Sequence, residues 1–275
     1  MPGGPGRPPG PPYGSPPPKS NTGLIVGLLA GAGLLIVVAL VVVVVVARGG
    51  NDSKEPTASG GRSPRAGSNG GVVPAGQLRP SDYDDNASWS LWNPLDDRTD
   101  DPDAMTVSEV FDDPESRNAE GSDKKVYSLQ GLGRMDTDCA QAVWGDGLKA
   151  ALQGYGCTQV ARGVYADETK RIAGHVAVFN LRDVTSADQF IKDLDPAQGK
   201  GFVTPLPGQS SPLDRFGSGF TGADGGAYGH FVVVSWVGFT DGTSGDSASI
   251  DTIAPRSAVE RAAKNFLFPR LTKAR

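Results

Sequence analysis

The sequence predicts an α+β domain with an antiparallel sheet and helices on one face, the split βαβ plan of ferredoxin-like folds. A disordered tail, one transmembrane helix and a flexible linker are expected before it. Three observations carry this prediction. The 275 residues include 38 Gly and 22 Pro, so a sizeable part of the chain is unsuited to a packed core. Residues 24–47 carry no charged side chain. After Ser122, the apolar residues recur at strand and helix periods in turn.

Residues 1–22 are the predicted tail, because nine Pro fall within the first 18 positions and cannot sustain a helix or a core. Residues 23–47 are the predicted transmembrane helix. The 24 residues from Leu24 to Ala47 cover ~36 Å as a helix, enough to cross a ~30 Å hydrocarbon core. The alternative is a cleaved signal peptide, whose apolar region is usually only ~7 to 15 residues long.

Three glycines at a spacing of four, Gly23, Gly27 and Gly31, fall on one face of this predicted helix. Small residues on one face let two helix backbones approach closely in a membrane. We therefore expect these glycines to be a helix-packing site that supports a homodimer. The alternative is that they reflect the ordinary frequency of Gly in membrane helices.

The orientation of the span rests on conflicting indications. Two basic residues precede it, and four follow within 20 residues, namely Arg48, Lys54, Arg62 and Arg65. Taken literally, the positive-inside rule then places the C-terminus in the cytoplasm. However, long downstream domains translocate largely regardless of loop charge, and a cysteine pair suits an oxidising compartment. We predict a single-pass cell-membrane protein with a cytoplasmic N-terminus and an extracytoplasmic C-terminal domain.

Residues 48–81 have the Gly- and Ser-rich composition of a flexible linker. The acidic strip that follows, residues 82–121, has eleven acidic residues and one basic residue, Arg98, between positions 82 and 113. Its aspartates lack the order of a calcium-binding EF-hand loop, so we expect a solvated surface. Trp89, Leu91 and Trp92 should dock the strip on the domain, and 104–111 should form a short helix. The acidic net charge of −5 argues against a nucleic-acid partner.

Residues 122–275 are the predicted extracytoplasmic α+β domain. Strands are expected at 126–132, 157–165, 172–181 and 228–239, with a short extended run at 201–206. Helices are expected from the Asp138 cap to Gly154, from Thr185 or Ser186 to Leu194, and from Pro255 at a first-turn position to about Pro269. The Gly-rich stretch 222–229 lacks the Lys and Ser or Thr of a phosphate-binding loop, so we expect a surface hairpin or mobile flap.

Cys139 and Cys157 are the only cysteines, and they lie in the part of the chain that we place outside the membrane. An even count in an oxidising compartment predicts a disulfide. An unbroken helix over 138–153 would hold the two too far apart, but Gly145 and Gly147 can break it. The alternatives to a disulfide are that the two cysteines are buried free thiols or that they have a redox or metal-binding role.

No catalytic, cofactor-binding or metal-binding motif emerges, and we predict that the protein is not an enzyme. His175 and His230 lie in apolar strands, where a buried core histidine is the usual finding and a shared metal site is the alternative. Gly245–Ser247 resembles the nucleophile signature of trypsin-like proteases, but too few residues follow it.

The Pro/Gly tail, the valine-rich span, the linker and the stretch Asp138 to Tyr165, with its two cysteines, together resemble single-pass membrane proteins of actinobacteria, streptomycetes especially. The resemblance implies an extracytoplasmic domain in a cell-envelope protein. We therefore predict a membrane-anchored binding or interaction module of the envelope, acting through the sheet face or residues 207–229 on a protein or envelope partner. The alternatives are an extracytoplasmic enzyme with an unrecognised site and a structural component that oligomerises through its membrane helix.

Overall fold

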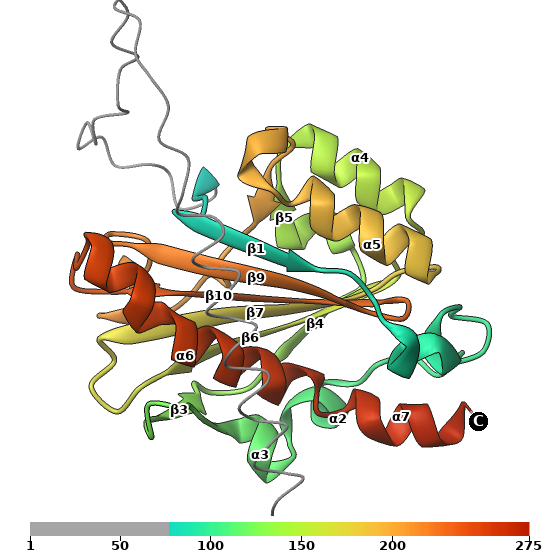
Figure 1. Ribbon diagram of the computed structural model, residues 1–275, viewed down its shortest axis with the longest axis horizontal. Coiled ribbons are helices and arrows are strands. Elements are labelled where there is room, and N and C mark those ends of the chain that lie inside the picture. Colours follow the sequence, from blue (N-terminus) through green and yellow to red (C-terminus); the bar gives the residue numbers. More distant parts are fainter. Residues whose placement is uncertain (1–76, 275) are drawn as a thin grey trace, which may run out of the picture. The chain divides into compact units, whose positions relative to one another are not determined.

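The computed structural model describes residues 77–274, and their central feature is a mixed sheet with helices on both faces (Figure 1). The strands of the sheet run in the order β1-β9-β10-β7-β6-β3-β2, and β4 also pairs with β6. Their bounds are Asp82–Asn86 (β1), Asn118–Glu120 (β2), Val126–Leu129 (β3), Arg134–Asp136 (β4), Gln159–Ala166 (β6), Ile172–Asn180 (β7), Thr221–Tyr228 (β9) and Phe231–Phe239 (β10). A separate two-stranded sheet joins β5 (Val143–Trp144) to β8 (Phe202–Val203).

Helices α4 and α5 cover one face of the sheet, and the other described α-helices lie on the opposite side (Figure 1). The α-helices are α2 (Val107–Phe111), α3 (Pro114–Arg117), α4 (Asp146–Gly154), α5 (Val184–Asp193), α6 (Asp246–Lys264) and α7 (Leu267–Lys273). The short 3-10 helices are η2 (Ser90–Leu95), η3 (Cys139–Ala142), η4 (Pro196–Gln198) and η5 (Leu213–Arg215).

Strands β7 and β10 form the centre of the sheet and are buried along their whole length. They pair antiparallel over nine residues, from Phe231 opposite Asn180 to Phe239 opposite Ile172. Alternate side chains of β10 enter different cores: Val233 and Val237 pack toward α6, whereas Val232 and Trp236 pack toward α4 and α5. A strand that is buried on both faces has a nearly continuous run of apolar residues. This pattern in the sequence predicted the two strands.

The ferredoxin-like prediction is wrong. A split βαβ plan places the first strand of the repeat in the interior of the sheet. Here β3 instead pairs with β6, on the side away from the sheet centre, and β10 pairs directly with β7. The physical reason is burial: β3 is four residues long and only partly buried, so it does not suit a central place that the apolar β10 fills over nine residues.

Two further parts of the predicted fold class are also wrong. The sheet is mixed, because β1 runs parallel to β9. Helices lie on both faces, because both faces of β7 and β10 are apolar and each must be covered. The α+β class of the prediction holds, but with a large eight-stranded mixed sheet.

The Gly-rich stretch 222–229 is a strand inside the sheet and not a surface flap. β9 lies between β1 and β10, and its small residues leave room for large neighbours. A Cβ on Gly225 would come within 2.3 Å of the Tyr83 hydroxyl, which donates a hydrogen bond to the Ile191 carbonyl at 2.7 Å. The glycines of β9 are therefore packing residues.

Several predicted helix boundaries also differ. The helix expected from Asp138 is broken into η3, β5 and α4, and Gly145 caps α4 with a φ of 92°. Asp183, and not Thr185 or Ser186, caps α5 by accepting the Ser186 N–H. Helix α6 begins nine residues before Pro255, and the buried Ala248 and Thr252 hold this first half against the sheet.

The acidic strip is joined to the main sheet through β1 and β2. Trp92 is 2% exposed and packs against Tyr228 of β9 and Phe268 of α7, whereas Trp89 is 61% exposed. Asp101 is buried and accepts a 2.7 Å hydrogen bond from Arg270 on α7. Part of the strip is thus neutralised by buried arginine and is not wholly solvated.

The predicted tail, the predicted transmembrane helix with Gly23, Gly27 and Gly31, and most of the linker lie outside the described residues. Within residues 77–274, none of the helices has the length and apolar character needed to cross a membrane.

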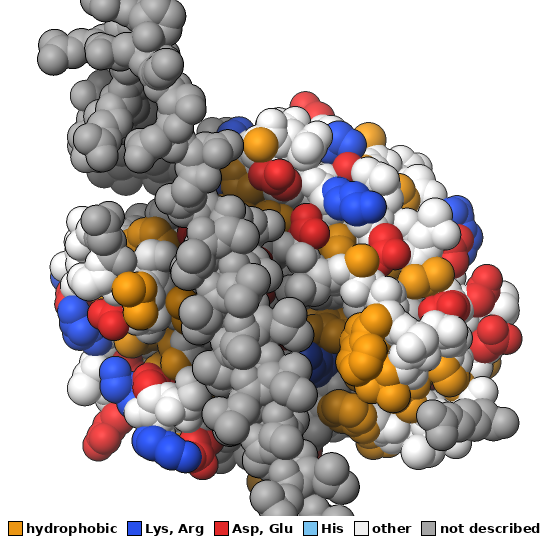
Figure 2. Space-filling model, in the orientation of Figure 1, with side chains coloured by type: hydrophobic (Ala, Val, Ile, Leu, Met, Phe, Trp, Pro, Cys, Tyr) orange, Lys and Arg blue, Asp and Glu red, His pale blue; other side chains and the backbone are white. Residues whose placement is uncertain are grey.

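Acidic and basic side chains are interspersed over α4 and α5 in Figure 2, whereas hydrophobic side chains gather over the region of η2 and α7. Trp89, next to η2, and Phe268 in α7 are the large exposed hydrophobic residues of these segments.

Gly225→Ala should lower the free energy of unfolding by about 1 to 3 kcal/mol, because the added methyl would displace the Tyr83 ring in a packed interior. Gly154→Ala, at the end of α4 with no neighbouring atom within 4 Å, is the matched control and should leave stability equal or slightly higher. Urea unfolding of the full chain measures both. Equal stability of the two variants would contradict this packing role.

Candidate functional site

A pocket of about 400 Å³ lies between the sheet and the loop that connects β8 to η5. We call it the His175 pocket. It is lined by Leu78, His175, Thr204–Gln209, Leu213, Asp214 and Phe216. Most of these side chains are apolar, and His175 projects from the central strand β7. The pocket thus combines apolar walls supplied by a loop with one polar ring supplied by the sheet.

The loop fixes which nitrogen of His175 carries the proton. In the sequence Pro205–Leu206–Pro207, only Leu206 has a backbone N–H, and it donates to His175 Nδ1 at 3.1 Å. A neutral imidazole that accepts at Nδ1 carries its proton on Nε2. His175 therefore presents an N–H donor at Nε2, and this atom has no hydrogen-bond partner among the described residues.

The ring of His175 is held in its neutral form. Burial lowers the pKa of His175 to about 3, and the positive charge of Arg162 contributes in the same direction. Desolvation disfavours the charged form of a base, so His175 stays a neutral donor at physiological pH.

The neighbours of His175 on the same sheet face also present unpaired donors. Trp236 lies directly opposite it on β10, and the Trp236 Nε1 has no partner among the described residues. Arg162 on β6 donates through Nε and Nη2 to Asp136 at 2.8 and 2.6 Å, which leaves its Nη1 unpaired. Buried polar groups are normally paired with protein or water. Trp236 and Arg162 are not among the residues that line the pocket, so these donors lie behind its floor.

Phe216 forms one wall of the His175 pocket and covers the floor. Its ring centroid lies 4.5 Å from that of His175 and 5.1 Å from that of Trp236, both in edge-to-face geometry. The pocket floor is therefore an ordered aromatic cluster, which fixes the orientation of the His175 ring.

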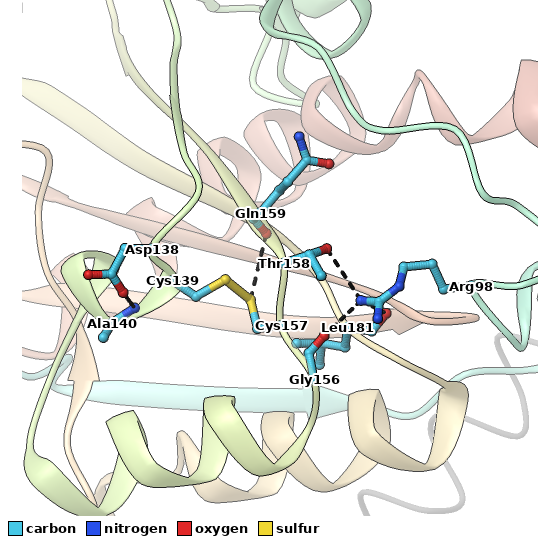
Figure 3. Close-up of a disulfide and its surroundings, with 9 residues drawn as sticks. All are labelled: Arg98, Asp138, Cys139, Ala140, Gly156, Cys157, Thr158, Gln159 and Leu181. Atoms are coloured by element: carbon cyan, nitrogen blue, oxygen red, sulfur yellow. Dashed lines mark hydrogen bonds between the residues drawn. A yellow bond between two sulfur atoms is a disulfide. The ribbon is translucent and has the colours of Figure 1, made fainter.

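The second candidate is the disulfide, and the structure confirms the predicted bridge between Cys139 and Cys157 (Figure 3). Their Cα atoms are 6.3 Å apart, because the break at Gly145 lets η3 fold back toward the end of α4. The bridge lines a groove of about 520 Å³ with Asp138, Lys149 and Gln153 among its other residues.

Arg98, a basic residue of the acidic strip, holds the segment after this disulfide. Its Nη1 donates to the carbonyls of Gly156 and Leu181 at 2.7 and 3.1 Å and to the Thr158 hydroxyl at 3.3 Å (Figure 3). The groove has no unpaired buried polar atom of its own among the described residues. We therefore regard the disulfide as a structural cross-link.

The two histidines do not form one site. His175 lies opposite Trp236, six residues along β10 from His230, which corresponds to ~20 Å of strand. His230 is fully buried, and its Nε2 lies 3.5 Å from a carboxylate oxygen of Asp101. Burial lowers the pKa of His230 although Asp101 opposes the shift. Residues 77–274 contain no cluster of side chains suited to a metal ion.

Sequence reasoning missed the His175 pocket. It placed function on the sheet face or on residues 207–229, and the pocket includes the first part of that segment. The alternation of proline around Leu206 is the pattern that could have indicated it, because it leaves a single N–H donor in the turn.

Comparisons of the chain with protein-family models, with curated proteins and with solved structures found no match. The resemblance to streptomycete membrane proteins therefore stays a prediction.

His175 should make the protein less stable in acid. The unfolded chain binds a proton at His175 below pH ~6.5, whereas the folded chain does so only near pH 3, so unfolding is favoured as the pH falls through this range. Between pH 6.5 and 5.0 the expected loss is about 2 kcal/mol. Urea unfolding at the two pH values should show a smaller loss in His175→Phe than in the wild type. An unchanged loss in His175→Phe would contradict the assignment.

Proposed function

We propose that this chain is a membrane-anchored binding module of the cell envelope and that it binds its ligand in the His175 pocket. The observation that carries the proposal is the pocket itself, in which apolar side chains of a loop cover the rigid centre of the sheet beside His175. Apolar cavities of 300 to 1,000 Å³ with a few placed polar groups are typical of small-molecule sites.

The proposed location rests on the sequence and on the disulfide. Residues 24–47 are long and apolar enough to cross a bilayer once. A disulfide between the two cysteines suits an oxidising compartment outside the cytoplasm. Both support a single-pass membrane protein with its N-terminus in the cytoplasm and its domain outside.

The position of the pocket suits a ligand-binding role. Its walls come from the loop 204–216, which is exposed at Pro207 and Asp214, whereas its floor comes from the rigid sheet centre. Binding residues are often carried on loops that a rigid scaffold positions. Ligand entry then requires no change in the sheet.

Filling the pocket should abolish binding. The full chain in lipid nanodiscs is incubated with a small-molecule extract of the cell envelope, re-isolated and examined by mass spectrometry. The wild type should enrich a compound that Thr204→Trp does not, because the indole fills the pocket. Leu132→Trp, at an exposed position of the β3–β4 turn, is the control and should behave as the wild type. The proposal fails if Thr204→Trp, with an unchanged thermal unfolding temperature, enriches the same compound.

The proposed orientation is tested with the native cysteines. In intact cells that express the full chain, a membrane-impermeant maleimide should label Cys139 and Cys157 only after an impermeant reductant has opened the disulfide. Labelling after lysis and reduction serves as the reference for complete reaction. Protection in intact cells under both conditions, with free thiols on lysis, would place the domain in the cytoplasm.

A further inference from the structure

We infer that the first half of α6 docks on the surface of the lipid bilayer, with Ile250 and Ile253 inserted among the lipids. The inference rests on the anchoring part of the proposed function, a single membrane span before the domain. It concerns a surface that the His175 pocket does not include.

The outward face of α6 changes from apolar to polar along the helix. Ile250 and Ile253 are 70% and 52% exposed, and their spacing of three residues places them on one face. The next exposed residues along this face are Ser257 and Arg261. The opposite face, which includes the buried Ala248, packs against the sheet, so the isoleucines have no place in the core. The exposed apolar surface is therefore confined to the beginning of α6.

The chain enters the domain at this same end of α6. The backbone N–H of Ser81, directly before β1, donates to the Thr221 carbonyl at 2.7 Å. The backbone N–H of the neighbouring Phe220 donates to the Thr243 carbonyl at 2.8 Å, shortly before α6 begins. Figure 1 shows the starts of β1 and α6 at the same end of the sheet, whereas α7 lies toward the other end. The exposed isoleucines therefore lie near the point where the predicted linker joins the domain.

The predicted linker keeps this end of the domain close to the membrane. Residues 48–76 join the predicted span to the described domain. A flexible linker of this length has a mean reach of ~30 Å, similar to the ~28 Å length of α6 itself. Tethering of this kind gives an effective concentration in about the millimolar range. A small apolar surface is then enough for the domain to dock on the bilayer.

The charges around the isoleucines favour a neutral lipid surface. Asp251 is exposed between them, and Arg171 in the neighbouring loop pairs with Asp241 at 2.6 Å. A surface without an excess of basic residues gains little from anionic lipids, so the burial of apolar side chains must supply the attraction. Helices that lie on a bilayer bury their apolar face ~5 to 10 Å into the boundary between headgroups and acyl chains.

Trp89 and Phe268 form the competing apolar surface. Both are exposed, and Trp92 beneath them lies with its ring centroid 5.6 Å from that of Phe268. This surface lies over η2 and α7, toward the end of the domain away from the start of β1 (Figures 1 and 2). Docking there would turn the attachment point of the linker away from the membrane, so we assign the bilayer to α6.

A fluorescent probe on α6 tests the docking in the full chain in phosphatidylcholine nanodiscs. The cysteine of Ile253→Cys can be labelled with the apolar dye NBD without reduction, because the native cysteines form a disulfide. A phosphatidylcholine that carries a spin label near the carbonyl end of one acyl chain should quench about half of this fluorescence. The label in Ser257→Cys should be quenched less, and the label in Lys273→Cys, exposed on α7, should not be quenched.

A charge beside the probe tests whether apolar insertion holds the helix on the bilayer. Ile250→Asp, added to the labelled Ile253→Cys chain, should abolish the quenching, because a carboxylate would have to leave water. Thr272→Asp, which adds the same charge at an exposed position of α7, is the matched control and should leave the quenching unchanged. Both sites are exposed, so the thermal unfolding temperature of both variants should equal that of the labelled parent chain.

The outcomes distinguish this inference from the proposed function. Absence of quenching at Ile253→Cys, in a chain that has entered the nanodiscs, overturns the docking and leaves an anchored binding module. Quenching at Lys273→Cys that equals or exceeds that at Ile253→Cys overturns the inference in favour of the surface around Trp89. Quenching that requires phosphatidylglycerol overturns the apolar mode of docking. A full chain that does not enter nanodiscs overturns the membrane anchor, and with it the proposed function.

Discussion

The burial of β7 and β10 on both faces is the constraint on which the rest of the structure depends. Nine consecutive residues of each strand are removed from water, so both faces need a covering layer and every polar side chain there needs a partner. Helices α4 and α5 cover one face, and α6 covers most of the other. His175 receives one hydrogen bond from the loop and keeps its Nε2 unpaired among the described residues, and Asn180 of the same strand also keeps an unpaired buried atom.

The same burial explains how an acidic segment can belong to the sheet. Arg256 on α6 is 4% exposed and lies 3.0 Å from Asp224 and 3.4 Å from Asp82, so it links β1 and β9. Burial raises the pKa of Asp224 to about 6, although Arg256 favours its ionised form. Arg270 on α7 binds Asp101 and Glu109 in the same way. Arginines of the C-terminal helices thus offset the charge of Asp82, Asp101 and Glu109, which the sequence places more than 100 residues earlier.

The strands and helices with strong apolar periodicity could be predicted from the sequence, as β6, β7, β10 and α5 show. The order of the strands could not be predicted from the sequence. It depends on which of β3 and β10 takes the place beside β7, and the longer, fully buried β10 takes it. Strand β9 could not be predicted either, because its glycines carry no apolar pattern. Gly225, for example, is explained only by Tyr83, which lies in a strand far away in sequence. The disulfide was predictable from the cysteine count and from Gly145. The His175 pocket was not, because its loop and its histidine are brought together only by the fold.

The state of the His175 ring tests the account most directly. Nitrogen-15 NMR of the imidazole rings in the full chain, with His230→Gln to assign the signals, reports which nitrogen is protonated and whether the ring titrates. The account predicts a proton on Nε2, a bare Nδ1 and no titration of His175 between pH 5 and 8. A proton on Nδ1, or protonation of the ring within this range, would contradict it, because Leu206 N–H would then not hold His175 as a buried neutral ring.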